Sequence, residues 1–112
     1  GVENDTKDGT CIRDYIHVND IADAHLLGLN YLNKDKQQST VFNLGNGKGF
    51  SVREVIDKVK DITKKNFKVI EKDGRKGDPS VLVADDTKAR KLLKFKPKFK
   101  SLEEIIKTLV ID

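Results

Sequence analysis

The spacing of the apolar residues changes several times along this chain, and this pattern restricts its fold more than any other feature. Over residues 12–18 (IRDYIHV), apolar and polar residues alternate, as they do in a half-buried strand. Over residues 21–32, the apolar residues instead recur about every 3.6 positions, which is the period of an amphipathic helix. Because both periods occur along one chain, we predict an α/β fold.

We expect about four short strands and about four helices. So few strands cannot make a doubly wound dinucleotide-binding domain, so we expect a small domain that lacks the Rossmann fold. The strands are predicted at residues 12–18, 40–44, 67–70 and 81–84, and the helices at 20–33, 52–65, 88–93 and 102–110. The predicted helix caps are Asn19 or Asp20, Ser51 in a capping box with Glu54, Asp85 or Asp86, and Ser101 with Glu104.

Composition bounds the class of protein. The 112 residues are one domain's worth of chain, of which 37% are apolar and 36% charged. No run of 18 apolar residues occurs, so we expect no membrane span, and the start of the chain does not resemble a signal peptide. Cys11 is the single cysteine and cannot form an internal disulfide, which fits a reducing compartment such as the cytoplasm.

A glycine-rich segment, NLGNGKG at residues 43–49, lies between a predicted strand and a predicted helix. A loop in that position can bring backbone amides to a phosphate. It matches neither G-x-G-x-x-G nor the Walker loop, because no G-K-[ST] is present. The alternative is that the glycines supply a tight turn, and we favour this structural role.

Residue types that often catalyse reactions or bind metals form no complete set in the sequence. His17 and His25 are eight residues apart with no third ligand nearby, so we expect structural histidines and no metal site. Cys11 has no histidine nearby and is not expected to act as a nucleophile. These residues alone therefore supply no catalytic site.

Basic and aromatic residues alternate at residues 94–100 (KFKPKFK). Proteins that bind single-stranded nucleic acid use such a pattern. A half-buried extended segment shows the same alternation, with phenylalanine inward and lysine outward, and we favour this interpretation. The chain has 22 basic residues, but this segment contains no arginine.

Two arginines lie in segments that suit an anionic ligand. The loop GRKGDP at residues 74–79 offers the Arg75 cation to a phosphate and the Asp78 anion to sugar hydroxyls. From spacing alone we favour a weak surface ion pair between these two residues. Arg13 lies at the start of the first predicted strand, and from its residue type it could either pair with Asp14 or bind a ligand phosphate. Tyr15, two residues further on, lies on the same face of that strand.

Three segments together resemble a known family. They are DGTCIRDYIHVNDIADA at residues 8–24, VFNLGNGKGFSVREVI at 41–56 and RKGDPSVLVAD at 75–85. In this order they resemble the extended short-chain dehydrogenase/reductase family, and within it the UDP-glucose 4-epimerases (UDP-galactose 4-epimerases). The resemblance covers nearly the whole chain.

The resemblance implies that residues 1–112 are the C-terminal UDP-sugar-binding domain of a longer enzyme. Members of this family use NAD to take a hydride from C4 of the sugar and return it to the other face, which interconverts UDP-glucose and UDP-galactose. Their NAD-binding domain and their catalytic tyrosine and lysine precede the region matched in this chain. We therefore assign no catalytic or cofactor-binding residue to it, and expect it to be inactive alone. The implied full-length enzyme is a cytoplasmic homodimer of galactose and nucleotide-sugar metabolism.

The resemblance also implies roles for single residues. Arg13 and Arg75 match the arginines that contact the UDP diphosphate, and Asp78 matches the acid that accepts from the ribose hydroxyls. Tyr15 lies in the same binding strand, and Leu82 matches a position that lines the sugar pocket. Because leucine is smaller than the tyrosine of some members, the match implies room for UDP-N-acetylhexosamines.

The chain departs from the family pattern at two points. Gly74 stands where members often carry a further arginine, and LKF at residues 93–95 replaces a common L-G-W. Two rival interpretations remain at this stage. One is a part of another NAD-dependent nucleotide-sugar epimerase, dehydratase or decarboxylase, and the other is a lysine-rich module that binds nucleic acid.

Overall fold

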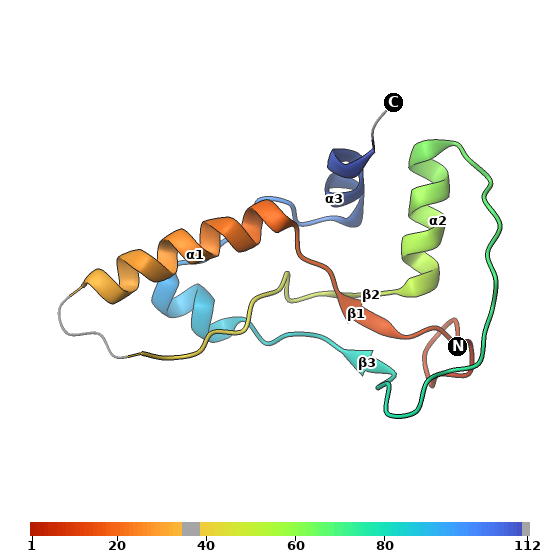
Figure 1. Cartoon of the computed structure of the whole chain (residues 1–112), viewed down its shortest axis with the longest axis horizontal. Helices are drawn as coiled ribbons and strands as arrows, with labels where there is room; N and C mark the ends of the chain where they lie inside the picture. Colours follow the sequence, from red (N-terminus) through yellow and green to blue (C-terminus); the bar gives the residue numbers. More distant parts are fainter. Residues whose placement is uncertain (35–38, 111–112) are drawn as a thin grey trace.

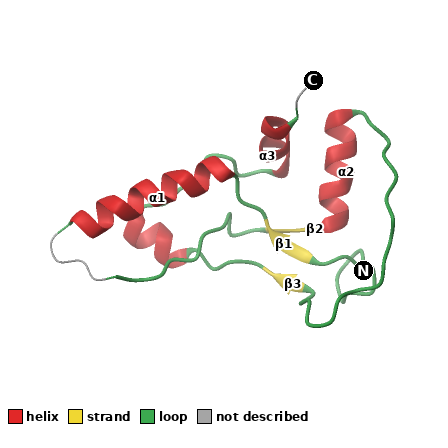
Figure 2. Ribbon diagram, in the orientation of Figure 1, coloured by secondary structure: helices red, strands yellow, loops and turns green. Residues whose placement is uncertain are grey.

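The computed structural model describes residues 1–34 and 39–110. A small sheet lies near the middle of the molecule, with helices extending from it in two directions (Figures 1 and 2). The α/β prediction is confirmed, with three strands in place of the four expected. The elements in chain order are β1 (Ile12–Asp14), α1 (Val18–Asn33), β2 (Gly49–Ser51), α2 (Val52–Thr63), β3 (Val81–Leu82), the π-helix η1 (Ala89–Leu93) and α3 (Leu102–Leu109).

The sheet has the order β2-β1-β3, so β1 is its central strand. It pairs antiparallel with β2, with Arg13 opposite Phe50, and parallel with β3, with Arg13 opposite Leu82. The close approach of the strands requires Gly49, because a Cβ there would lie 2.5 Å from Cγ2 of Ile12 and 2.6 Å from Cγ2 of Val83. The sheet therefore joins three segments that are far apart in sequence.

Two predicted strands are wrong. Residues 40–44 and 67–70 form no strand, although both are rich in residues that favour one. A strand requires a hydrogen-bonded neighbour, and neither segment pairs with another described strand. The sequence pattern also missed β2, because its residues Gly-Phe-Ser show no alternation, and it placed the ends of β1 and β3 too far along the chain.

Two of the four predicted helix caps are confirmed. Ser51 accepts from the amide of Glu54 in a complete capping box, and Ser101 accepts from the amide of Glu104. The cap of α1 is His17, whose Nδ1 accepts from the amide of Asn19 at 3.0 Å, so the predicted cap at Asn19 or Asp20 is wrong. The predicted cap at Asp85 or Asp86 is also wrong, because the cap of η1 is Lys88, which makes no side-chain cap hydrogen bond. The Asp85 carboxylate accepts from the hydroxyl and amide of Thr87, and these hydrogen bonds lower its pKa.

The main apolar cluster joins α1 to η1 and the segment after it. Ala24 on α1 packs with Ala89, Leu93 and Phe95, which are all buried. From Leu93 onward the side chains alternate between buried and exposed, with Phe95 inward and the lysines outward. This confirms the half-buried extended interpretation of residues 94–100.

His17 connects the start of α1 to α3. Its ring is 5% exposed and stacks on Phe99, with the ring centroids 4.1 Å apart. Because Nδ1 accepts from a backbone amide, Nε2 carries the proton and donates to Oγ1 of Thr108 at 2.6 Å. Thr108 in turn donates to the carbonyl of Ile105. Every polar atom of the His17 ring is satisfied, which confirms a structural role.

Asp20 holds the end of the extended segment against α1. Its side chain is 1% exposed, and its carboxylate accepts from the amide of Lys98 at 2.8 Å and from that of Phe99 at 3.1 Å. Both oxygens of this buried carboxylate are therefore used by backbone donors, which offsets the cost of burying the charge.

Asp8 fixes the start of β1 to the start of α2. Its carboxylate accepts from the amide and hydroxyl of Thr10, and from the hydroxyl of Ser51 at 2.6 Å. The hydrogen bond from Ser51 is the largest cause that lowers the pKa of Asp8 from 3.8 to about 2, followed by those from Thr10. The ionised form of Asp8 is the one that fits the fold.

The chain is extended for its length. Its radius of gyration is 16.9 Å, whereas a compact domain of about 100 residues has about 13 Å. Large apolar side chains remain exposed on several elements, among them Leu26 and Leu29 on α1 and Ile70 in the segment before β3. Among the described residues, no helix has the length and apolar character that crossing a membrane requires.

Replacing Asp20 by alanine should lower the free energy of unfolding by about 3 kcal/mol, because two buried amides lose a charged acceptor. Asp23→Ala is the matched control, since Asp23 lies on the same helix and forms an exposed ion pair with Lys98 at 3.7 Å. The control should cost less than about 1 kcal/mol. Chemical denaturation of the full-length protein measures both, and equal losses would contradict the role of Asp20.

The Asp8 hydrogen bonds predict a pH dependence. A carboxyl whose pKa is lower in the folded state stabilises the fold fully above the unfolded value of 3.8, and that contribution is lost as the pH falls through about 2. Wild type should therefore be more stable than Asp8→Asn at pH 7, and the difference should narrow towards pH 2. Denaturation at several pH values measures the difference, and a constant gap would argue against this assignment.

Candidate functional site

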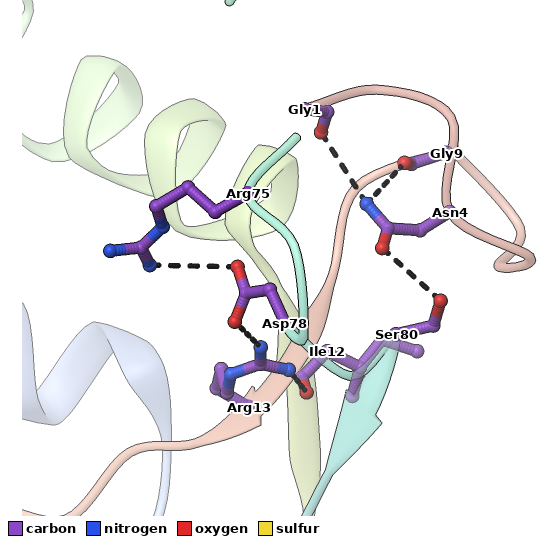
Figure 3. Close-up of polar contacts among 8 residues, drawn as sticks. All are labelled: Gly1, Asn4, Gly9, Ile12, Arg13, Arg75, Asp78 and Ser80. Carbon is purple, nitrogen blue, oxygen red and sulfur yellow. Dashed lines mark hydrogen bonds and ion pairs between the residues drawn. The ribbon is translucent and has the colours of Figure 1, made fainter. Parts of the chain in front are cut away.

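The sheet brings Arg13 together with the loop that precedes β3. Arg13 lies in the central strand, and the loop of residues 74–80 leads into β3 beside it. The amide of Ile12 donates to the carbonyl of Ser80 at 2.8 Å, which fixes the end of the loop against β1. Figure 3 shows the result, with Asp78 pointing between Arg13 and Arg75.

Asp78 is ion-paired to both arginines. Nη2 of Arg13 lies 2.9 Å from one carboxylate oxygen, and Nη2 of Arg75 lies 3.5 Å from the other. Arg13 also donates through Nη1 to the carbonyl of Ile12 at 2.8 Å, so its guanidinium is fixed at two points. The side chains of Arg13, Asp78 and Arg75 are 22%, 35% and 86% exposed, so the cluster lies at the surface with Arg13 as its most buried member.

Asp14 does not pair with Arg13, which corrects one of the two alternatives for that arginine. Its carboxylate instead accepts from the amides of Asn46 and Gly47, at 2.9 and 3.2 Å. A Cβ on Gly45 would lie 2.3 Å from the same carboxylate, so only glycine fits there. The glycine-rich loop is therefore a tight turn held by Asp14, as favoured from the sequence.

Asn4 supports the site and was missed by the sequence analysis. Its Nδ2 donates to the carbonyl of Gly9 at 3.1 Å, and its Oδ1 accepts from the hydroxyl of Ser80 at 3.1 Å. In this way the first residues of the chain hold the start of β3 (Figure 3). The polar segment of residues 1–7 has no periodic pattern that would have indicated such a contact.

Leu82 lies beside Arg13, whereas Tyr15 faces another part of the molecule. Leu82 is paired with Arg13 across the parallel strands and is 59% exposed, so its side chain is available on the site's surface. Tyr15 follows the end of β1 and lines a pocket of about 450 Å³ between α2 and α3, together with Val59 and Ile105. Burial is the main reason that the pKa of Tyr15 is raised, with nearby Cys11 adding to the effect and Arg13 opposing it.

The arrangement suits an anion that also carries hydroxyl groups. Two guanidinium groups converge on one point, and arginine is the side chain whose planar fork matches phosphate oxygens. Asp78 adds a carboxylate, which accepts from hydroxyl donors. His25 does not extend this site, since it is exposed on α1 and its Nδ1 donates to the carbonyl of Ile21 at 2.8 Å.

No cluster of three or more metal-binding side chains occurs in the described part of the chain.

Comparison with known proteins finds similar proteins along nearly the whole chain. A profile of the NAD dependent epimerase/dehydratase family matches residues 5–45. The UDP-glucose 4-epimerase of Halalkalibacterium halodurans is 47% identical over 106 residues, which are 95% of this chain and 31% of that protein. The solved UDP-Glc/GlcNAc 4-epimerase of Campylobacter jejuni is 52% identical with a TM-score of 0.83, over 96% of this chain and 32% of that one. The UDP-glucose 4-epimerase of Brucella ovis in complex with NAD is 41% identical with a TM-score of 0.88, over 96% of this chain and 33% of that one.

These matches span nearly all of this chain but only about a third of the length of the relatives. The chain is thus similar to the NAD dependent epimerase/dehydratase family over residues 5–45, and over nearly its whole length to about a third of a UDP-glucose 4-epimerase.

Proposed function

We propose that this chain is the C-terminal UDP-sugar-binding domain of an NAD-dependent enzyme that interconverts UDP-glucose and UDP-galactose. The observation that carries the proposal is the convergence of Arg13 and Arg75 on one point of the surface, 62 positions apart in sequence. The names of the three relatives given above, two UDP-glucose 4-epimerases and one UDP-Glc/GlcNAc 4-epimerase, support it.

In this proposal the two arginines bind the diphosphate and Asp78 accepts from the ribose hydroxyls. Arg13 is already oriented by the carbonyl of Ile12, so little freedom is lost when it binds a phosphate oxygen. Holding the substrate by its diphosphate leaves the hexose free to present either face to the cofactor. Binding energy from the part of the substrate that does not react is thereby used to position the part that does.

NAD would bind elsewhere in the full-length protein. The glycine-rich loop of residues 43–49 does not fit the dinucleotide, because the amides of Asn46 and Gly47 already donate to Asp14. We therefore assign none of the described residues to the cofactor. We also propose, from the family resemblance alone, that the full-length enzyme is a cytoplasmic homodimer.

The substrate range extends to UDP-N-acetylhexosamines in this proposal. Leu82 is exposed beside Arg13, and leucine occupies less volume than tyrosine at the position that matches the sugar pocket. The Campylobacter jejuni relative, which is named for both UDP-Glc and UDP-GlcNAc, supports this range. The nucleic-acid alternative has no support, because Phe95 of the KFKPKFK segment is buried and the partly buried Phe99 already stacks on His17, so neither ring is presented to bases.

Arg75→Ala should weaken binding of UDP-glucose to the full-length enzyme at least about tenfold, because a charged hydrogen bond to phosphate is worth about 1.5–3 kcal/mol. Lys76→Ala, one residue along the same loop, removes the same charge without a guanidinium fork and should have a smaller effect. Calorimetry measures both affinities. Equal losses would show that only the charge of the loop matters.

Leu82→Tyr should lower the ratio of kcat/KM for UDP-GlcNAc to kcat/KM for UDP-glucose. The added ring penalises only the larger substrate, so activity on UDP-glucose should change little. The two kcat/KM values are measured in wild type and variant of the full-length enzyme. A wild-type enzyme without activity on UDP-GlcNAc, or a variant with an unchanged ratio, would contradict the proposed role of Leu82.

A further inference from the structure

Both arginines of the site are already occupied by an anion from the protein itself. Arg13 uses one nitrogen on the carbonyl of Ile12 and another on Asp78, and Arg75 contacts the second oxygen of the same carboxylate. The Asp78 carboxylate therefore stands where an anionic ligand would have to bind (Figure 3). Any such ligand must compete with it for both cations.

The loop allows Asp78 to give up this position. Its side chain is 35% exposed, and the amide of Asp78 makes only a long hydrogen bond, 3.4 Å, to the carbonyl of Arg75. Gly77, directly before it, has a φ of 77° and open space around it. Once released from the arginines, the Asp78 carboxylate can accept hydrogen bonds from hydroxyl groups of the ligand.

We propose that Asp78 is an internal competitor for the arginine pair, and that its displacement couples the two halves of the ligand. The phosphate half displaces the carboxylate from Arg13 and Arg75, and the released carboxylate becomes available to the hydroxyls of the nucleoside half. A ligand that carries both halves then binds more tightly than the separate halves would indicate. This inference rests on the proposed function, because it takes the ligand to be a nucleoside diphosphate sugar.

The first test uses inorganic pyrophosphate, which has the phosphates but no hydroxyl-bearing sugar. Asp78→Asn removes the competing charge and keeps the size of the side chain, so pyrophosphate should bind the full-length variant about fivefold more tightly than wild type, the size expected of a partly exposed ion pair. Calorimetry at constant ionic strength measures both dissociation constants.

Asp73→Asn is the matched control. It removes one negative charge from the same loop, and the Asp73 carboxylate forms no ion pair with the described residues. A change of less than about twofold in the control supports displacement of Asp78. If pyrophosphate affinity stays the same in Asp78→Asn, or rises equally in both variants, the competitor role is wrong.

A second measurement needs no variant and applies if Asp78→Asn does not fold. Saturating pyrophosphate should raise the affinity of wild-type enzyme for uridine, also about fivefold, because linkage makes the coupling reciprocal. Uridine affinity that is unchanged or lowered by pyrophosphate would overturn the coupling.

Binding of UDP to the wild-type enzyme distinguishes a failure of the coupling from a failure of the proposed function. If UDP binds and the pyrophosphate measurements show no competition, the coupling fails and the proposed function stands. If wild type does not bind UDP, the proposed function fails and the coupling fails with it.

Discussion

Hydrogen bonds from backbone amides to aspartate carboxylates hold together segments of this chain that are far apart in sequence. Asp14 accepts from Asn46 and Gly47, and Asp20 accepts from Lys98 and Phe99. The buried apolar cluster between α1 and η1 is small, so packing alone would leave the relative positions of these segments poorly defined. A carboxylate accepts strongly and in a restricted geometry, and these contacts therefore fix where the central strand, the glycine-rich turn and the extended segment lie.

The candidate site depends on the same framework. Arg13 reaches Asp78 across 65 positions of sequence because β1 lies between β2 and β3, which places the loop before β3 beside it. Gly49 permits this close packing, since any Cβ there would meet Ile12 and Val83. The site therefore depends on the order of the strands. The few hydrogen bonds of this short sheet determine both the fold around it and the positions of Arg13 and Arg75.

Local features of the sequence predicted local structure well. The capping box at Ser51 and the cap at Ser101 formed as expected, and so did the inward-outward alternation around Phe95, because each depends on residues a few positions apart. Strands at 40–44 and 67–70 were predicted wrongly because a strand also requires a distant neighbour. The pairing of Arg13 with Asp78 could not be read from spacing for the same reason, and only the family resemblance indicated that both residues belong to one site.

The two wrongly predicted strands and the exposed apolar residues have a common physical explanation. Val41 is 78% exposed and Ile70 is 66% exposed, in segments whose residue types favour a half-buried strand. Such preferences are satisfied only when the backbone also pairs with a neighbouring strand, and neither segment pairs with one among the described residues. The chain spans about a third of its relatives' length. The Arg75 side chain, at the edge of the site, is likewise 86% exposed. Water screens the attraction between so exposed a cation and an anionic ligand, so the attraction is strongest when further protein excludes that water.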